Sequence, residues 1–176
     1  MLITPEEGYQ QFINILWDNI KRGYALLLKP KYKLISSREL NTQVNSVFPG
    51  LANTNSDFAF KACDWKTWEN FITADWTNRK KYIVDYFDCD NYSDAFRAHA
   101  AELLDLNTAG KFGCSVITDK GEVIPHRAVL IVATDENDKL ACYVFESQTD
   151  GWQKVEKGKP IRIGTWSYNA LSSAFN

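Results

Sequence analysis

The chain has 176 residues, 45% of them hydrophobic, and a formal net charge of −2 at pH 7. This is the composition of one ordinary globular domain, and the scattered charges exclude the basic face of a typical nucleic-acid-binding protein. The sequence has no run of 18 apolar residues, so no segment is expected to span a membrane. The N-terminus does not resemble a signal peptide. We therefore expect a cytoplasmic protein whose four cysteines are reduced. Without CxxC pairs, these cysteines do not predict a zinc site.

The first 108 residues are predicted to be mainly helical. A helix is predicted over residues 4–23, where Thr4 and Glu7 form a capping box and Gly23 is a stop signal. Its apolar positions repeat at helical spacing: Phe12, Ile13, Leu16 and Ile20.

Three further helices are predicted in chain order. They begin at about residue 37, at a cap on Asp64, and at residue 91, and the last runs to residue 107. Residues around 48–57 are rich in Pro, Gly and Asn and predict a loop. A group of tryptophans is expected to pack in the core or to line a cleft: Trp65, Trp68 and Trp76.

The remaining residues are predicted to form strands, because they are rich in Val, Ile and aromatic side chains. The expected strands are 110–119, 122–134, 139–147 and 159–167. The stretch "TDENDK" predicts a turn that closes a hairpin between the second and third of them. Helices first and an antiparallel sheet second predict a single α+β domain, with a helical part at about 1–108 and a sheet part at about 109–176.

Cys89 lies directly before the last predicted helix. The N-terminal end of a helix carries partial positive charge and unpaired N–H groups, which favour a thiolate and can hold an oxyanion. Nearby carboxylates oppose a thiolate: Asp85, Asp88, Asp90 and Asp94. Cys89 is therefore either a nucleophile or a structural thiol. The other three cysteines lie in apolar or mixed stretches and are expected to be buried.

His126 and Glu146 are the expected partners of Cys89. His126 opens the apolar strand "HRAVLIVA", and Glu146 follows the apolar run "CYVF" on the next strand. Each lies about ten residues from the middle of the predicted turn, so an antiparallel hairpin would bring the two side chains together. The order nucleophile, base and orienting group predicts a Cys-His-Glu triad with the layout of papain-like thiol hydrolases.

Three stretches, "YFDCDNYSDAF", "HRAVLIV" and "YVFESQTDGW", give the chain a resemblance to a known family. They resemble the papain-like protease domain of the agglutinin from Marasmius oreades and its bacterial and phage relatives. The resemblance covers roughly residues 80–155 and implies a cysteine peptidase or isopeptidase. It places the functional residues at Cys89, His126, Glu146 and Gln148. Asn91 stands where the family often has Asp, and Ser147 where it often has Pro.

The same resemblance implies calcium-dependent activity, with ligands beside the nucleophile. Asp88, Asp90 and Asn91 could supply oxygen atoms to Ca²⁺, which would neutralise the charge that opposes the thiolate. The alternative without metal is that Asp88 and Asp90 cap and stabilise the start of the helix.

Two other functions are compatible with the sequence. NlpC-like cell-wall peptidases also carry a "DC" motif at a helix start, but the Ser-Gly that follows their cysteine is missing here. The non-enzymatic alternative is a structural or interaction module of a phage or toxin assembly, which could be virion-associated. The favoured hypothesis is a cysteine hydrolase acting on a peptide or protein, with cell-wall peptide as a possible substrate. The backbone N–H of Cys89 would form the oxyanion hole together with Tyr82 or Gln148.

Overall fold

The computed structural model describes residues 5–28 and 30–175. These ranges contain four α-helices, one short 3₁₀ helix and nine strands. The helices are α1 (Pro5–Leu28), α2 (Ser37–Val47), α3 (Trp65–Ala74), η1 (Thr77–Arg79) and α4 (Cys89–Leu104). The strands are β1 (Tyr32–Ser36), β2 (Ala52–Asn55), β3 (Ala59–Cys63), β4 (Ala109–Ile117), β5 (Val123–Thr134), β6 (Leu140–Glu146), β7 (Gly151–Lys154), β8 (Ile161–Ile163) and β9 (Trp166–Phe175).

Local capping signals account for where two of the helices begin. Ser36 caps α2 in a capping box with Glu39. The Asp64 side chain accepts a hydrogen bond from the backbone N–H of Thr67 at the start of α3, which confirms the predicted cap.

The first helix differs from the prediction at its C-terminal end. It continues through Gly23 to Leu28, because a helical glycine costs only about 1 kcal/mol and the residues that follow are good helix formers. The predicted cap at Thr4 lies outside the described residues.

The strands form one large mixed sheet and one small sheet. The large sheet has the order β2-β9-β4-β5-β6-β7, with β8 on β9, and β1 pairs with β3 separately. Strands β4, β5 and β6 pair as antiparallel neighbours, which confirms the predicted hairpin. A purely antiparallel sheet after a helical half was a wrong prediction. Three strands fall in the first 108 residues, and β2 pairs parallel with β9 from the predicted loop.

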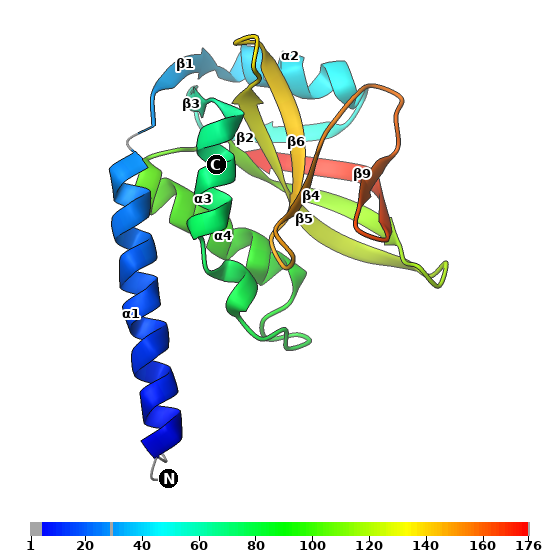
Figure 1. The fold of residues 1–176 in the computed structure, drawn as a ribbon. Coiled ribbons are helices and arrows are strands. Elements are labelled where there is room, and N and C mark those ends of the chain that lie inside the picture. Colours follow the sequence, from blue (N-terminus) through cyan, green and yellow to red (C-terminus); the bar gives the residue numbers. More distant parts are fainter. Residues whose placement is uncertain (1–4, 29, 176) are drawn as a thin grey trace.

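Two hydrophobic clusters lie on opposite faces of the central strands. One contains Leu40 and Val44 of α2, and the other contains Phe71 of α3 and Phe96 of α4. Alternation along β5 divides its side chains between the clusters, with Leu130 on the α2 side. Figure 1 shows α2 near one end of the sheet and α3 and α4 beside each other on the other side. Trp65 and Trp68 are core residues, as one of the two interpretations expected.

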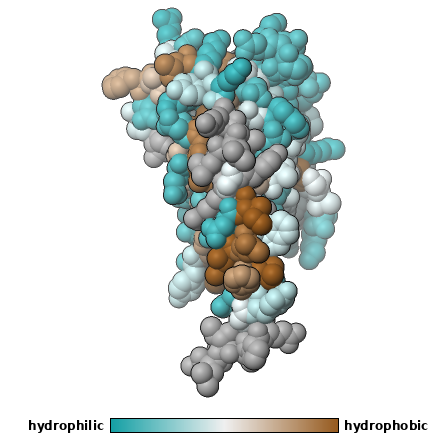
Figure 2. Space-filling model, turned by 60° about the vertical axis from the view of Figure 1, so that its left-hand side comes forward, coloured by the Kyte–Doolittle hydropathy of each residue, from teal (hydrophilic) through white to brown (hydrophobic). Residues whose placement is uncertain are grey.

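Helix α1 leaves several large apolar side chains exposed in its N-terminal part. Phe12 is 61% exposed and Trp17 is 52% exposed, and Figure 2 shows the hydrophobic surface that such residues form. The helix touches α3 and α4, and its N-terminal part extends beyond them (Figure 1). The predicted apolar positions are therefore helical but do not join either core cluster. In the described ranges, no helix is long and apolar enough to cross a membrane.

Candidate functional site

A buried histidine–carboxylate pair forms the centre of the site. His126 Nε2 lies 2.6 Å from Glu146 Oε2, and the two residues are only 8% and 2% exposed. The β5–β6 ladder ends with Val129 opposite Phe145, so Glu146 and His126 lie just beyond its last pair. The predicted proximity of His126 and Glu146 is present, although they meet diagonally rather than as directly opposed residues.

Cys89 approaches this pair from the first residue of α4. Its side chain is half-buried and hydrogen-bonds with the ring of His126. Burial disfavours the charged imidazolium, but hydrogen bonds with Cys89 and Glu146 outweigh it and raise the pKa of His126 to about 9. The ring is therefore protonated at neutral pH, with the side chain of Cys89 against it.

The carboxylate of Glu146 is fully engaged by hydrogen bonds within the protein. Its Oε2 accepts from the hydroxyl of Tyr168 at 3.0 Å as well as from His126, and its Oε1 accepts from the backbone N–H of Gln148 at 3.2 Å. Burial and the neighbouring carboxylate raise the pKa of Tyr168, so its hydroxyl stays protonated and donates a hydrogen bond to Glu146. These contacts hold Glu146 in one orientation toward the imidazole.

The sequence analysis did not predict two residues of the site, Trp166 and Tyr168, which both lie on β9. Tyr168 bonds Glu146, and the ring of Trp166 meets the imidazole of His126 edge to face, with centroids 5.5 Å apart at 88°. Nothing local in the sequence around Trp166 or Tyr168 indicates that β9 returns to the end of β5. The only signal was the aromatic, β-prone composition of this stretch.

The three remaining cysteines do not resemble Cys89 in their surroundings. Cys63, Cys114 and Cys142 are buried, and burial raises the pKa of each thiol to about 12. They are inert at neutral pH, because the thiolate is the reactive form.

The two other candidate side chains lie near different parts of the site. Tyr82 is half-exposed. Burial, and to a lesser extent the charges of Cys89 and Asp88, raise the pKa of the Tyr82 hydroxyl. Gln148 bonds Glu146 through its backbone and lines a cavity beside it.

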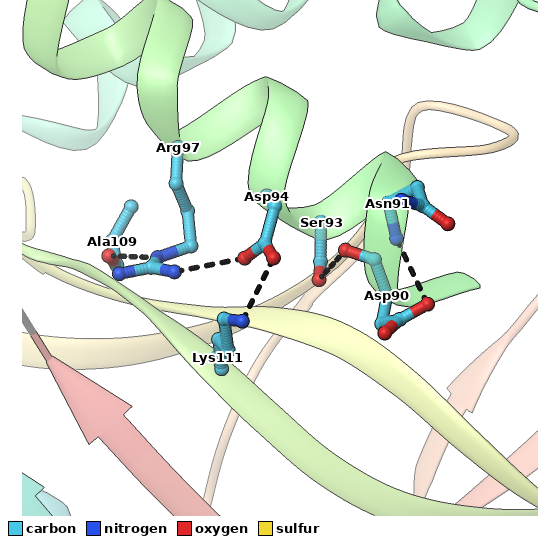
Figure 3. Close-up of polar contacts among 7 residues, drawn as sticks. All are labelled: Asp90, Asn91, Ser93, Asp94, Arg97, Ala109 and Lys111. Atoms are coloured by element: carbon cyan, nitrogen blue, oxygen red, sulfur yellow. Dashed lines mark hydrogen bonds and ion pairs between the residues drawn. The ribbon is translucent and has the colours of Figure 1, made fainter. Parts of the chain in front are cut away.

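Three of the four aspartates around Cys89 divide into two groups. Asp94 points away from the start of α4 toward Arg97 and Lys111, at 3.1 and 2.8 Å (Figure 3). Asp88 and Asp90 contact each other, and the hydrogen bond between their carboxyl groups raises the pKa of Asp88 and lowers that of Asp90. Two carboxyl groups therefore lie in contact with each other beside Cys89.

The three predicted calcium ligands differ in the contacts that they make. Asp88 Oδ1 is buried and, within the described ranges, has no hydrogen-bond partner, so a cation could use it. Asp90 contacts it, but Asn91 Oδ1 accepts from the backbone N–H of Asp88 at 3.2 Å. Asp88 and Asp90 thus fit a cation and Asn91 caps the helix instead. Among the described residues, no group of three or more His, Cys, Asp or Glu side chains is arranged to hold a metal ion.

Comparison with known proteins gives a fold relationship only. No protein-family model matches the chain, and no curated protein matches its sequence. Two solved structures are similar: the PSL1a–E64 complex, with TM-score 0.54 and 15% identity, and Polyporus squamosus lectin bound to the human-type influenza-binding epitope Neu5Acα2-6Galβ1-4GlcNAc, with TM-score 0.55 and 13% identity. The matches cover 81% of this chain and 51% and 49% of those chains. The chain therefore shares an agglutinin-like α+β fold over about half their length.

These neighbours correct the predicted classification. The sequence motifs placed the chain among hydrolases, specifically thiol proteases, and among phage proteins. The solved neighbours are lectins, so the comparison contradicts these labels for the chain, and agglutinin-like is the one predicted label that it supports.

Proposed function

We propose that the chain cleaves a peptide or isopeptide bond with a triad of Cys89, His126 and Glu146. The observation that supports this most directly is the buried 2.6 Å contact between His126 and Glu146, with the half-buried thiol of Cys89 on the same imidazole. A buried ion pair without a chemical role would be expensive to keep beside a thiol at a helix start. The papain-like assignment, and a peptide or cell-wall substrate, belong to this proposal, as does a cytoplasmic or virion location.

Each residue of the triad has one chemical role in the proposed reaction. The thiolate of Cys89 attacks the carbonyl carbon, and the resulting oxyanion faces the N-terminus of α4. His126 gives its proton to the leaving amine, so that the C–N bond breaks and a thioester remains. A water molecule, deprotonated by His126, then releases the acid and restores the thiol. Glu146 orients the ring and stabilises its charge.

The proposal is tested by the selectivity of alkylation at neutral pH. Iodoacetamide should add once to the native protein, at Cys89, because the other thiols are buried with pKa values of about 12. Peptide mapping by mass spectrometry locates the adduct. E64, the compound in one neighbouring structure, is a second probe of the same thiol. A native protein in which Cys89 reacts no faster than a free cysteine would contradict an activated nucleophile.

A calcium ion at Asp88 and Asp90 is part of the proposal. When bound, the cation would neutralise the charge of the two carboxylates and lower the negative potential at Cys89. Calcium at ten times its Kd should stabilise the fold by about 1.4 kcal/mol, or roughly 3–6 °C in Tm. Asp88→Asn should abolish the shift, whereas the exposed control Asp119→Asn should keep it. Titration calorimetry without a calcium signal at millimolar concentration would leave the two aspartates as a helix-start feature only.

Glycan binding is a second candidate, favoured by the lectin neighbours and by two half-exposed tryptophans, Trp152 and Trp166. Aromatic rings at a surface can pack against the apolar face of a sugar. Titration with Neu5Acα2-6Galβ1-4GlcNAc tests it: binding that Trp152→Ala or Trp166→Ala weakens and Cys89→Ala preserves would support it. Titrations without heat at millimolar trisaccharide would exclude this ligand.

A further inference from the structure

A cavity of about 280 Å³ opens beside the triad. It lies between the turn that follows β6 and the turn that joins β8 to β9, and Gln148, Ile163 and Thr165 are among its lining residues. A cavity of about 150 Å³ can hold benzene, so this one has room for a large side chain. Trp166 and Tyr168 supply aromatic walls.

The cavity is on the Glu146 side of the imidazole. Because His126 Nε2 bonds Glu146, Nδ1 is the ring nitrogen left for Cys89. Glu146 lines the cavity and Trp166 packs its ring edge to face with the imidazole. The cavity therefore adjoins Glu146 and Trp166, two residues that contact the imidazole. The leaving amine takes its proton at Nδ1, the nitrogen that faces the sulfur, so a side chain on the leaving residue reaches the cavity by extending past the imidazole.

The polar groups of the cavity favour an uncharged occupant. The one carboxylate, Glu146, already accepts hydrogen bonds from His126, Tyr168 and the backbone of Gln148. It has no oxygen free of a protein donor to offer a cationic side chain. The remaining wall includes the buried Ile163 and the aromatic rings of Trp166 and Tyr168, which stabilise apolar groups by burial.

We infer that this cavity binds an aromatic or large aliphatic side chain of the residue on the leaving-group side of the cleaved bond. The inference rests on the proposed function, because it assigns the leaving amine to the His126 side. An apolar side chain there would also cover the rim beside Trp166 and keep water from the imidazole. An apolar pocket of this kind discriminates between side chains by roughly 10–200-fold.

The test uses the reverse of the leaving step, so it needs no natural substrate. The Cys89 thiolate attacks p-nitrophenyl acetate, the C–S bond forms and p-nitrophenolate leaves. An added amino-acid amide then attacks the thioester carbonyl, the C–N bond forms, the C–S bond breaks and the amine proton passes to His126. The ratio of acetylated amide to acetate measures binding of the amine in the cavity. Phenylalanine amide and leucine amide should trap the acetyl group at least 10-fold better than glycine amide.

Variants locate the selectivity in the cavity. Thr165→Phe places a ring in the cavity and should reduce the preference for phenylalanine amide to within about threefold of glycine amide. Thr73→Phe adds the same ring at an exposed position on α3 and should keep the wild-type preference. The partition ratio of each variant is normalised to the amount of acetyl-enzyme, measured by mass spectrometry.

The outcomes separate the two proposals. If no acetyl group forms on Cys89, the proposed function fails. If acetyl-Cys89 forms but the three amides trap it equally, or if Thr165→Phe keeps the wild-type preference, the assignment of this cavity is wrong while the nucleophile stands.

Discussion

Cys89→Ala should abolish amide cleavage while the protein stays folded. Removing a nucleophile that acts as part of a triad costs roughly 10⁴-fold or more in turnover. The fold should tolerate the change, because Cys89 is half-buried at the first turn of α4 and alanine is a good helix former. Turnover of a cleaved peptide and the Tm, measured on the same preparation, check both parts.

Cys142→Ala is the matched control for this experiment. Cys142 is fully buried on β6 in the hydrophobic cluster that faces α2. Its removal leaves a small cavity and should cost about 1 kcal/mol of unfolding free energy with turnover unchanged. Wild-type turnover in Cys89→Ala, on any substrate that the protein cleaves, would show that the proposed mechanism is wrong.

Glu146→Gln should lower turnover by roughly tenfold to a thousandfold, the contribution of one positioned group to acid–base catalysis. The amide keeps the shape and one acceptor oxygen but removes the charge that stabilises the imidazolium. In one orientation of the new amide its NH₂ group faces the donors His126 and Tyr168, and in the other it faces the backbone N–H of Gln148. Leaving a buried donor without its acceptor costs about 1–3 kcal/mol. Glu146→Ala should lose more activity and more stability, because all three donors lose their partner.

The charge of Glu146 should also change how the unfolding free energy depends on pH. The pKa of His126 is raised from 6.5 to about 9 in the folded protein. The charge on His126 therefore stabilises the fold fully below pH 6.5, and this contribution is lost as pH rises through 9. In Glu146→Gln the pKa of His126 should be lower than in wild type, because the charge that opposes the effect of burial is gone. The variant should therefore lose less stability than wild type between pH 6.5 and 9.

The alkylation rate of Cys89 against pH is the measurement that isolates Glu146 from its structural role. Both Glu146 variants should react more slowly than wild type at neutral pH, since a weaker imidazolium supports less thiolate. Superimposable curves for wild type and Glu146→Gln would mean that Glu146 does not influence the Cys89–His126 pair. Gln148 would then be the first alternative orienting group to replace.

Local signals determined much of the secondary structure. The caps at Ser36 and Asp64 act within one turn of their helices, and the turn before Lys139 is closed by Asp135, whose Oδ1 accepts from the Lys139 N–H. The same locality predicted Cys89 at the start of the last helix, where it is the first residue of α4, and brought His126 near Glu146 through one hairpin. Each of these features depends on residues that are close in sequence, so the sequence determines it without knowledge of the whole fold.

Pairings between distant segments were decided only by the tertiary structure. Strand β2 was predicted as loop, because its partner β9 lies more than a hundred residues later and supplies the hydrogen bonds that make it a strand. The same strand β9 carries Trp166 and Tyr168 to the imidazole and the carboxylate. The sequence by itself predicted that Cys89, His126 and Glu146 belong to one site. Their engagement with one another, and the cavity beside them, required the packing of α4 and β9 around the ends of β5 and β6, which depends on burial across the whole core.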